Sequence, residues 1–326
     1  MTWLSDSALE RLRQAVEAPD LSATRYRLIE RIGRGGMGVV FLAEDLALGR
    51  RVALKVLDFP GESGDLGARL LREARILAQL EHPGIVPVHD AGTLPDGRVF
   101  YAMKFVEGRN LSEHAPSLVS VADHLHIFQK LCEAVAFAHS CGVLHRDLKP
   151  ENVMIGPFGE VLVMDWGVAR SLRDLATDAR VEPAHAGAAA GLSAPSRTRD
   201  GAVVGTPGYM SPEQARGQSA ALDERTDVYS LGMILHFLLG SNLRNLPAPL
   251  AAACVKATSA DPKDRYPSVA DLATEVARFL DGQPLKAYPE TLFRRVGRFL
   301  QRHQLVVWLV VAYLFTRILL ILFARP

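Results

Sequence analysis

One stretch decides the fold of this chain: His145-Arg146-Asp147-Leu148-Lys149-Pro150-Glu151-Asn152. The tripeptide Asp165-Trp166-Gly167 follows it closely along the chain. Asn152 and Asp165 carry side-chain oxygens, the kind of ligand that Mg²⁺ prefers. Chemistry at a phosphate depends on metal, positioning and charge neutralisation more than on covalent help from the protein. The stretch therefore predicts a site for metal and phosphate groups.

A glycine-rich stretch upstream is the first candidate for binding the phosphates. It follows the pattern GxGxxG, and the strand-like run VVFLAED comes directly after it. A dinucleotide fingerprint would need a helix there instead, so these glycines are expected to bend a β-hairpin whose backbone N–H groups can approach phosphates. On this motif alone, an ordinary glycine turn remains an equal alternative. The residues concerned are Ile32, Gly33, Arg34, Gly35, Gly36, Met37 and Gly38.

The next strand-like run contains Val52-Ala53-Leu54-Lys55. Lys55 is expected to reach the α- and β-phosphates of a nucleotide. A lysine in an apolar strand needs an acidic partner, because an unpaired buried charge is costly. Glu73, in the helix predicted to follow, is that partner, although a solvated helix glutamate would be the simpler explanation for any single Glu.

Taken together, these motifs resemble the eukaryotic-type protein kinase family, and specifically its bacterial serine/threonine members. Eight consecutive positions match HRDLKPEN, and Asp165-Trp166-Gly167 stands where the family has DFG. The resemblance implies an α+β, two-lobed fold, with a small five-stranded antiparallel lobe carrying one helix and a large, mainly helical lobe. It also implies transfer of the ATP γ-phosphate to Ser/Thr hydroxyls of proteins, the chain itself included, through self-association.

The resemblance assigns a role to each residue of the catalytic stretch. Asp147 would orient the attacking hydroxyl and accept its proton, and Lys149 would neutralise charge on the γ-phosphate. Asn152 and Asp165 would hold Mg²⁺, for which Mn²⁺ would also serve. A lysine two residues after the catalytic aspartate accompanies Ser/Thr acceptors in the family.

Residues 101–108, YAMKFVEG, resemble the hinge between the two lobes of the family. Met103 would stand at the back of the adenine pocket, and the backbones of Lys104 and Val106 would hydrogen-bond the base. The ring would lie between Val40, Ala53 and Met154. Without the resemblance, these are simply apolar core positions.

Trp166 departs from the family's usual Phe. We expect it to pack under the helix that carries Glu73, in a stack with Leu77, Val88 and His145. The indole N–H then needs an acceptor.

Residues 205–213, GTPGYMSPE, resemble the family's stretch for docking protein substrates. Thr206 would hydrogen-bond Asp147 and Lys149. Three residues are expected to be structural: Glu213 pairing with Arg265, and Asp227 bracing the catalytic loop. The activation segment, 165–213, is long for the family. The run that follows Asp227 is short, and the helix that the family usually has there is expected to be missing.

Arg146 precedes the catalytic aspartate, and in the family such an arginine commonly pairs with a phosphate on the activation segment. Thr198 lies where bacterial relatives tend to carry an activating threonine, whereas Thr206 is better explained by docking. We therefore predict that Thr198→Ala lowers phosphate transfer several-fold, and an unchanged rate would contradict this. The simpler alternative is that Thr198 is a polar loop residue.

The organisation of the chain follows from these assignments. Strands are expected at 25–33, 39–45, 51–59, 86–90 and 99–105, a helix at 66–81, and mostly helices from 118 onward. The predicted units are an N-terminal helix and linker at 1–25, a kinase domain at 26–282 with lobes at 26–105 and 109–282, a basic segment at 283–304 and a transmembrane helix at 305–323.

The predicted membrane helix, Leu305–Phe323, is 19 residues long and would span roughly 28 Å, close to the ~30 Å hydrocarbon core. Arg317 costs about 2.5–3.5 kcal/mol on insertion scales, and the many Leu, Ile, Val and Phe residues outweigh it at roughly −0.3 to −0.6 each. A core helix or an interfacial helix remains an alternative. Arg294, Arg295, Arg298, Arg302 and His303 precede the run, so the predicted location is the inner membrane, in contact with its lipids, with the kinase domain in the cytoplasm.

Composition excludes some classes of function. The formal net charge of +1 gives no reason to expect a nucleic acid partner, because binding to its phosphates needs a clustered basic surface. Cys132, Cys141 and Cys254 are far apart, so buried, reduced thiols are expected. Two rivals remain: a pseudokinase acting as a membrane-tethered scaffold, and a small-molecule phosphotransferase of related shape.

Overall fold

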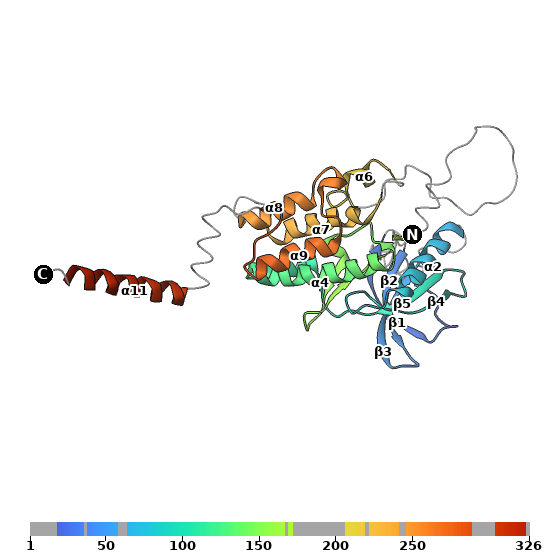
Figure 1. Cartoon of the computed structure of the whole chain (residues 1–326). Helices are drawn as coiled ribbons and strands as arrows, with labels where there is room; N and C mark the ends of the chain where they lie inside the picture. Colours follow the sequence, from blue (N-terminus) through green and yellow to red (C-terminus); the bar gives the residue numbers. More distant parts are fainter. Residues whose placement is uncertain are drawn as a thin grey trace, which may run out of the picture.

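Five antiparallel strands form the small lobe, in the order β1-β2-β3-β5-β4. The computed structural model describes residues 18–35, 38–57, 64–166, 169–171, 206–218, 222–240, 246–288 and 304–323. The five strands are β1 (Tyr26–Gly35), β2 (Gly38–Asp45), β3 (Arg50–Val56), β4 (Val88–Thr93) and β5 (Val99–Lys104). Figure 1 shows them beside α2 (Gly64–Gln79), with the larger helices gathered in the other lobe.

The β1–β2 hairpin depends on glycine at its turn. Gly35 and Gly38 face each other at the end of the ladder. Gly38 has φ +158°, and a Cβ there would lie 2.1 Å from the carbonyl oxygen of Val56. No other residue fits at this approach to β3 without moving the backbone.

Apolar side chains cover both faces of the small sheet. On one face, α2 buries Leu70, Ala74 and Leu77, which share one side of a helix because they are spaced by four and three residues. The other face is closed by a separate cluster that includes Leu21, Tyr26, Phe41 and other buried residues. A sheet covered on both sides is a rigid base for the residues that it carries.

The large lobe is built from α4 (Val121–Ser140), α7 (Glu224–Leu238), α8 (Ala248–Ala257) and α9 (Val269–Leu280). Ser120 caps α4 by accepting the backbone N–H of Asp123 at 3.0 Å. The helices bury a common core that includes Phe128, Leu131, Leu235 and Leu272. This core is continuous with the apolar cluster under α2, so the two lobes share packing.

Short elements connect the lobes and frame the loops of the site. They are β6 (Arg109–Asn110), α3 (Leu111–His114), η1 (Ala115–Ser117), β7 (Val143–Leu144), η2 (Pro150–Asn152), β8 (Val153–Ile155), β9 (Val161–Val163), β10 (Arg170–Ser171), α6 (Pro212–Ala215) and η5 (Pro262–Asp264). β6, β8 and β9 form a three-stranded sheet, and β7 pairs with β10.

The predicted two-lobed fold, with five antiparallel strands and a helical lobe, is confirmed. The fourth strand begins at Val88 rather than at residue 86, because Val86 is instead bonded to Val163 of β9. Cys132 and Cys254 are buried as expected, but the prediction was wrong for Cys141, which is exposed at the end of α4. Residues 1–17 of the predicted N-terminal helix and linker at 1–25, most of the activation segment and most of the basic segment lie outside the described residues.

The last element is α11 (Gln304–Phe323), which stands apart from the two lobes in Figure 1. Its described side chains are those of residues 308–317, a stretch of about 15 Å. In the part of the chain that the structure describes, no helix combines the length and the apolarity that crossing a membrane requires. The transmembrane helix expected at 305–323 is thus not found among the described residues.

Candidate active site

Lys55 is held by two acidic side chains that come from distant parts of the chain. Its Nζ donates to both carboxylate oxygens of Glu73, at 2.8 and 3.1 Å, and to Oδ1 of Asp165 at 2.9 Å. Lys55, the penultimate residue of β3, reaches toward α2, which supplies Glu73, and both residues are buried. The predicted contact between Lys55 and Glu73 is therefore present, and Asp165 joins it.

Burial and charge act against each other in this cluster. Burial lowers the pKa of Lys55, but its neighbours Tyr101, Glu73 and Asp165 outweigh burial and raise that pKa above its ordinary value. Burial raises the pKa of the Glu73 carboxyl, and Lys55 offsets this only in part. The protein atoms around Asp165 also act to raise its pKa, although its side chain is 45% exposed, but the charge and hydrogen bond of Lys55 reverse the effect and lower it. The lysine therefore stays a cation and Asp165 stays a carboxylate.

The catalytic loop places Asp147 between two hydrogen-bonding partners. Oδ1 of Asp147 accepts both the backbone N–H and the hydroxyl of Thr206, each at 2.9 Å. Nζ of Lys149 donates to Oδ2 of Asp147 at 2.9 Å and to the Thr206 hydroxyl oxygen at 2.7 Å. The predicted contacts of Thr206 are thus present, and they fix the orientation of the Asp147 carboxylate.

Asp227 of α7 holds the backbone of the catalytic loop, residues 145–152, in place. Asp227 is fully buried and accepts the backbone N–H groups of His145 and Arg146, each at 2.8 Å. This bracing holds Arg146 at φ +70°, an unusual conformation for a residue with a side chain. Burial acts to raise the pKa of Asp227, but its hydrogen bond with His139 leads the effects that lower it. Asp227 therefore holds the loop as a carboxylate.

Asn152 and Asp165 have the chemistry that a divalent cation requires. The amide nitrogen of Asn152 donates to the backbone oxygen of Asp147 at 2.9 Å, which leaves Oδ1 as the acceptor that can bind a metal. The backbone oxygen of Asn152 accepts the N–H of Met164, so the two candidate ligands lie at the ends of two paired strands: Asn152 just before β8 and Asp165 shortly after β9. Asp165 has φ +54° and an exposed carboxylate. One carboxylate and one amide oxygen fit Mg²⁺, which completes its shell with phosphates and water.

The residues predicted to bind adenine come from three strands of the small sheet, from the chain just after β5 and from β8 of the large lobe. Ala53 of β3 lies opposite Met103 of β5, and both are buried. The N–H of Lys104 donates to the oxygen of Pro87 at 3.0 Å, so only its carbonyl remains to accept from the base. Val106 is buried, whereas Val40 and Met154 are partly exposed. Of the glycine-rich loop, Gly36 and Met37 lie outside the described residues, Ile32 and Arg34 are exposed, and Gly33, Gly35 and Gly38 form the hairpin.

Trp166 fills the position under α2 that the sequence predicted. It is completely buried and shares a core cluster with Leu77 and Val88. Its ring centroid lies 4.6 Å from that of His145. The indole N–H donates to the oxygen of Val163 at 3.4 Å, which supplies the acceptor that a buried Trp needs.

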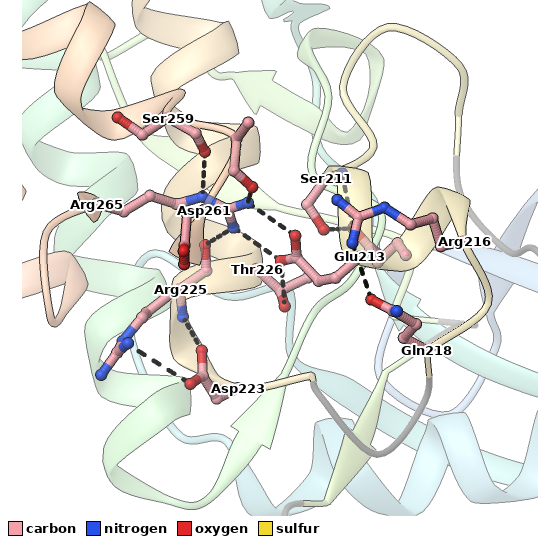
Figure 2. A network of polar contacts seen from close by, with 12 residues as sticks. Ser211, Glu213, Arg216, Gln218, Asp223, Arg225, Thr226, Ser259, Asp261 and Arg265 are labelled. Carbon is pink, nitrogen blue, oxygen red and sulfur yellow. Dashed lines mark hydrogen bonds and ion pairs between the residues drawn. The ribbon is translucent and has the colours of Figure 1, made fainter. Parts of the chain in front are cut away.

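A buried ion pair holds the end of residues 205–213, the stretch predicted to dock protein substrates, against the large lobe. Arg265 donates through both terminal nitrogens to the two carboxylate oxygens of Glu213, each at 2.7 Å (Figure 2). Figure 2 also shows Thr226 of α7 donating to Glu213, and Arg265 donating to the backbone oxygen of Ser259. The predicted contact of Glu213 with Arg265 is therefore present.

Three residues at the site were not singled out from the sequence. Tyr101 donates its hydroxyl to Glu73, Gln214 donates to the backbone oxygen of Arg146, and His139 bonds Asp227. Each contact joins residues that are far apart in sequence. It depends on the pairing register of β3 and β5 for Tyr101, on the place of α6 beside residue 146 for Gln214, and on the packing of α4 on α7 for His139. Thr198 lies outside the described residues, and its role stays a prediction.

Comparison with known proteins agrees with this geometry. Residues 26–246 match the family model described as the protein kinase domain. Serine/threonine-protein kinase PknD of Chlamydia trachomatis is 38% identical over 314 residues, which cover 83% of this chain and 33% of PknD. PknD of Chlamydia muridarum is also 38% identical, over 79% of this chain and 32% of its own length. The chain thus spans about a third of the length of these curated relatives.

The solved structures similar to this chain include kinase domains. The kinase domain of Mycobacterium tuberculosis PknI superimposes with a TM-score of 0.58 at 25% identity, covering 78% of this chain and 96% of that domain. A mutant form of the same domain gives a TM-score of 0.56 at the same identity, covering 78% of this chain and 95% of that domain. The chain belongs to the protein kinase family, and bacterial serine/threonine kinases are among its relatives.

Proposed function

We propose that this chain transfers the γ-phosphate of ATP to serine and threonine hydroxyls of proteins, itself among them. The observation that carries the proposal is the setting of Asp147, whose carboxylate is oriented by Thr206 and Lys149 at the start of the docking stretch. A substrate hydroxyl that approaches Asp147 would meet a carboxylate that Thr206 already holds in place to accept its proton.

The remaining residues supply the positioning and charge that phosphoryl transfer needs. Lys55 would contact the α- and β-phosphates, and Glu73 keeps its ammonium in place. Lys149 lies beside Asp147 and would neutralise charge on the γ-phosphate. Bound to Asn152 and Asp165, Mg²⁺ would screen the charge of the phosphates.

Two rival functions are less well supported. A pseudokinase that acts as a scaffold typically lacks one of the key polar residues, but this chain has Lys55, Asp147, Asn152 and Asp165, with the contacts described above. A small-molecule phosphotransferase would not need the docking stretch that places Thr206 on Asp147.

The test is to incubate the purified full-length chain with Mg-ATP and a general acceptor protein such as casein, and to map the phosphorylated residues by mass spectrometry. We expect phosphoserine and phosphothreonine on both proteins, and none after the metal is removed with EDTA. Tight binding of Mg-ATP without transfer to any protein would support the scaffold instead. Phosphotyrosine as the main product would contradict the assigned acceptor.

We also propose that residues 305–323 anchor the chain in the inner membrane, with the kinase domain on the cytoplasmic side. The support is the sequence of this run, which is apolar apart from Thr316 and Arg317 and follows a basic segment. Large apolar side chains in the described part of α11, including Trp308, Leu309 and Phe315, are exposed and need cover from lipid or another protein.

Membrane extraction tests this second proposal. The full-length chain should stay in the membrane pellet after washing with carbonate and dissolve only in detergent, whereas a chain ending at residue 303 should be released without it. Release of the full-length chain by carbonate or high salt would exclude a spanning helix and favour an interfacial one.

A further inference from the structure

Tyr101 is a buried polar residue at the site to which the mechanism above assigns no role. It lies near the middle of β5, directly opposite Lys55 of β3 in the strand pairing. The side chain is 1% exposed, and its hydroxyl donates to Oε1 of Glu73 at 2.8 Å. The carboxylate of Glu73 is therefore tied to two neighbouring strands, to β3 through Lys55 and to β5 through Tyr101.

The hydrogen bonds of Lys55 show why Glu73 needs Tyr101 as a second donor. An ammonium group has three N–H donors. Here they reach Oε1 and Oε2 of Glu73 and Oδ1 of Asp165. To bind the phosphates of a nucleotide, Lys55 has to turn at least one of these donors away from a carboxylate oxygen.

Tyr101 determines whether Glu73 still has a hydrogen-bond donor after Lys55 has moved. If the donor comes from Oε1 of Glu73, that oxygen keeps its hydrogen bond to Tyr101 and is not left unsatisfied in a buried site. Without the Tyr101 hydroxyl, Oε1 would have no donor among the side chains described around it whenever Lys55 turns away. A buried carboxylate that loses its donors is strongly destabilised, so Glu73 and α2 would tend to leave the sheet.

We propose that Tyr101 is a positioning residue for the nucleotide: its hydroxyl holds Glu73 and α2 on the sheet while Lys55 turns toward the phosphates. This inference rests on the proposed phosphate transfer and deepens it. The tyrosine needs no contact with the nucleotide. It acts through Glu73, and it makes the docked position of α2 less dependent on the lysine.

The test removes the hydroxyl alone, with Tyr101→Phe in the full-length chain. Tyr266→Phe is the matched control, because it removes another buried tyrosine hydroxyl in the core of the large lobe. The probe is adenylyl imidodiphosphate with Mg²⁺, which binds without transferring phosphate. Tyr101→Phe should weaken its affinity by roughly ten- to a hundredfold, the effect of losing one hydrogen bond to a charged group. Tyr266→Phe should leave the affinity unchanged, whatever its effect on the melting temperature.

The pH dependence of this affinity separates positioning from a general effect on stability. The groups that face Glu73 are Lys55, Tyr101 and Asp165. Burial already raises the pKa of Glu73, and loss of the Tyr101 donor raises it further. As pH falls, Glu73 in Tyr101→Phe should therefore take up a proton at a higher pH than in the wild type. The affinity of the variant should weaken at that higher pH.

Adding Glu73→Gln shows whether the hydroxyl acts through Glu73. The affinity of the double variant should equal that of Glu73→Gln alone, because the hydroxyl then has no carboxylate to hold. Wild-type affinity and pH dependence in Tyr101→Phe, or losses that add fully in the double variant, would overturn the inference. Absence of phosphate transfer by the wild type would instead contradict the proposed function, and the binding measurement would still test Tyr101.

Discussion

At the scale of single residues, Thr206 fixes the orientation of Asp147 and Lys149 without any bound substrate. Its backbone and hydroxyl both bond Oδ1 of Asp147, and its hydroxyl oxygen accepts from Lys149. Three groups from the catalytic loop and the docking stretch thus share one small network. The hydroxyl is the part of Thr206 that joins the aspartate to the lysine.

Thr206→Val keeps the shape of this side chain but removes the hydroxyl. We expect phosphate transfer to fall about tenfold or more, because Asp147 and Lys149 lose their shared partner and their mutual orientation. Thr206→Ser, which keeps the hydroxyl, should stay within a few-fold of the wild type. Steady-state rates of transfer to casein measure both, and equal rates for the two variants would show that the hydroxyl is not needed.

The ion pair of Glu213 and Arg265 should make the stability of the fold depend on pH. Burial acts to raise the pKa of Glu213, but its hydrogen bond with Arg265 leads the effects that lower it below the ordinary value of 4.5. A lowered pKa in the folded state means that the stabilisation is complete above the ordinary value and is lost as pH falls through the folded value. Glu213→Gln should therefore cost about 3–5 kcal/mol near pH 7, because a buried arginine is left unpaired.

The difference in free energy of unfolding between wild type and Glu213→Gln should shrink as the solution becomes more acidic than pH 4.5. Urea unfolding of both proteins at neutral and acidic pH measures this difference. A difference that stays constant over the whole range would show that the carboxylate charge of Glu213 does not stabilise the fold.

At the scale of secondary-structure elements, the close packing of α7 on the end of α8 depends on Gly232. A Cβ at Gly232 would lie 2.7 Å from Cβ of Ala257 and 2.8 Å from Cγ2 of Thr258. Alanine is normally preferred to glycine inside a helix by about 1 kcal/mol. Overpacking of a core costs about 1–3 kcal/mol and acts in the opposite direction.

We predict that the cost of overpacking exceeds the gain in helix propensity, so Gly232→Ala should lower the free energy of unfolding by up to about 2 kcal/mol. The matched control is Gly67→Ala in α2, where the nearest atom is the side-chain Cγ2 of Val99 at 3.3 Å. That substitution should be neutral or slightly stabilising. Urea unfolding distinguishes the two, and an equal gain in stability from both would mean that α7 and α8 can move apart freely.

The long elements were predictable from the sequence because their apolar spacing is regular. The strands around the glycine loop and Lys55, and the helix after them, lie within a few residues of the expected positions. The two-residue strands β6, β7 and β10 were not predicted, because such short elements carry no periodicity and exist only through their partners. The fourth strand starts late for a similar reason, since Val86 bonds β9 instead of β5.

At the scale of the whole molecule, the site is assembled where the two lobes share one apolar core. Tyr101 and Met103 of the small lobe belong to the same buried cluster as Leu148 and Trp166 of the large one. The pairing of Lys55 with Glu73 was predicted from the residues themselves, and the contacts of Thr206 and Glu213 were predicted from the resemblance to the kinase family. Neither the residues nor the resemblance predicted the contact of Tyr101 with Glu73, which depends on the pairing register of β3 and β5.

The most direct test of the central claim is the rate at which Asp147→Asn transfers phosphate from Mg-ATP to casein, compared with the wild-type chain. Asparagine keeps the size of the side chain but cannot accept a proton from the attacking hydroxyl. We predict that the rate falls about 10²- to 10⁴-fold, while the melting temperature and the affinity for adenylyl imidodiphosphate stay close to those of the wild type. Transfer by Asp147→Asn within a few-fold of the wild-type rate would contradict the assignment of Asp147 and the mechanism built on it.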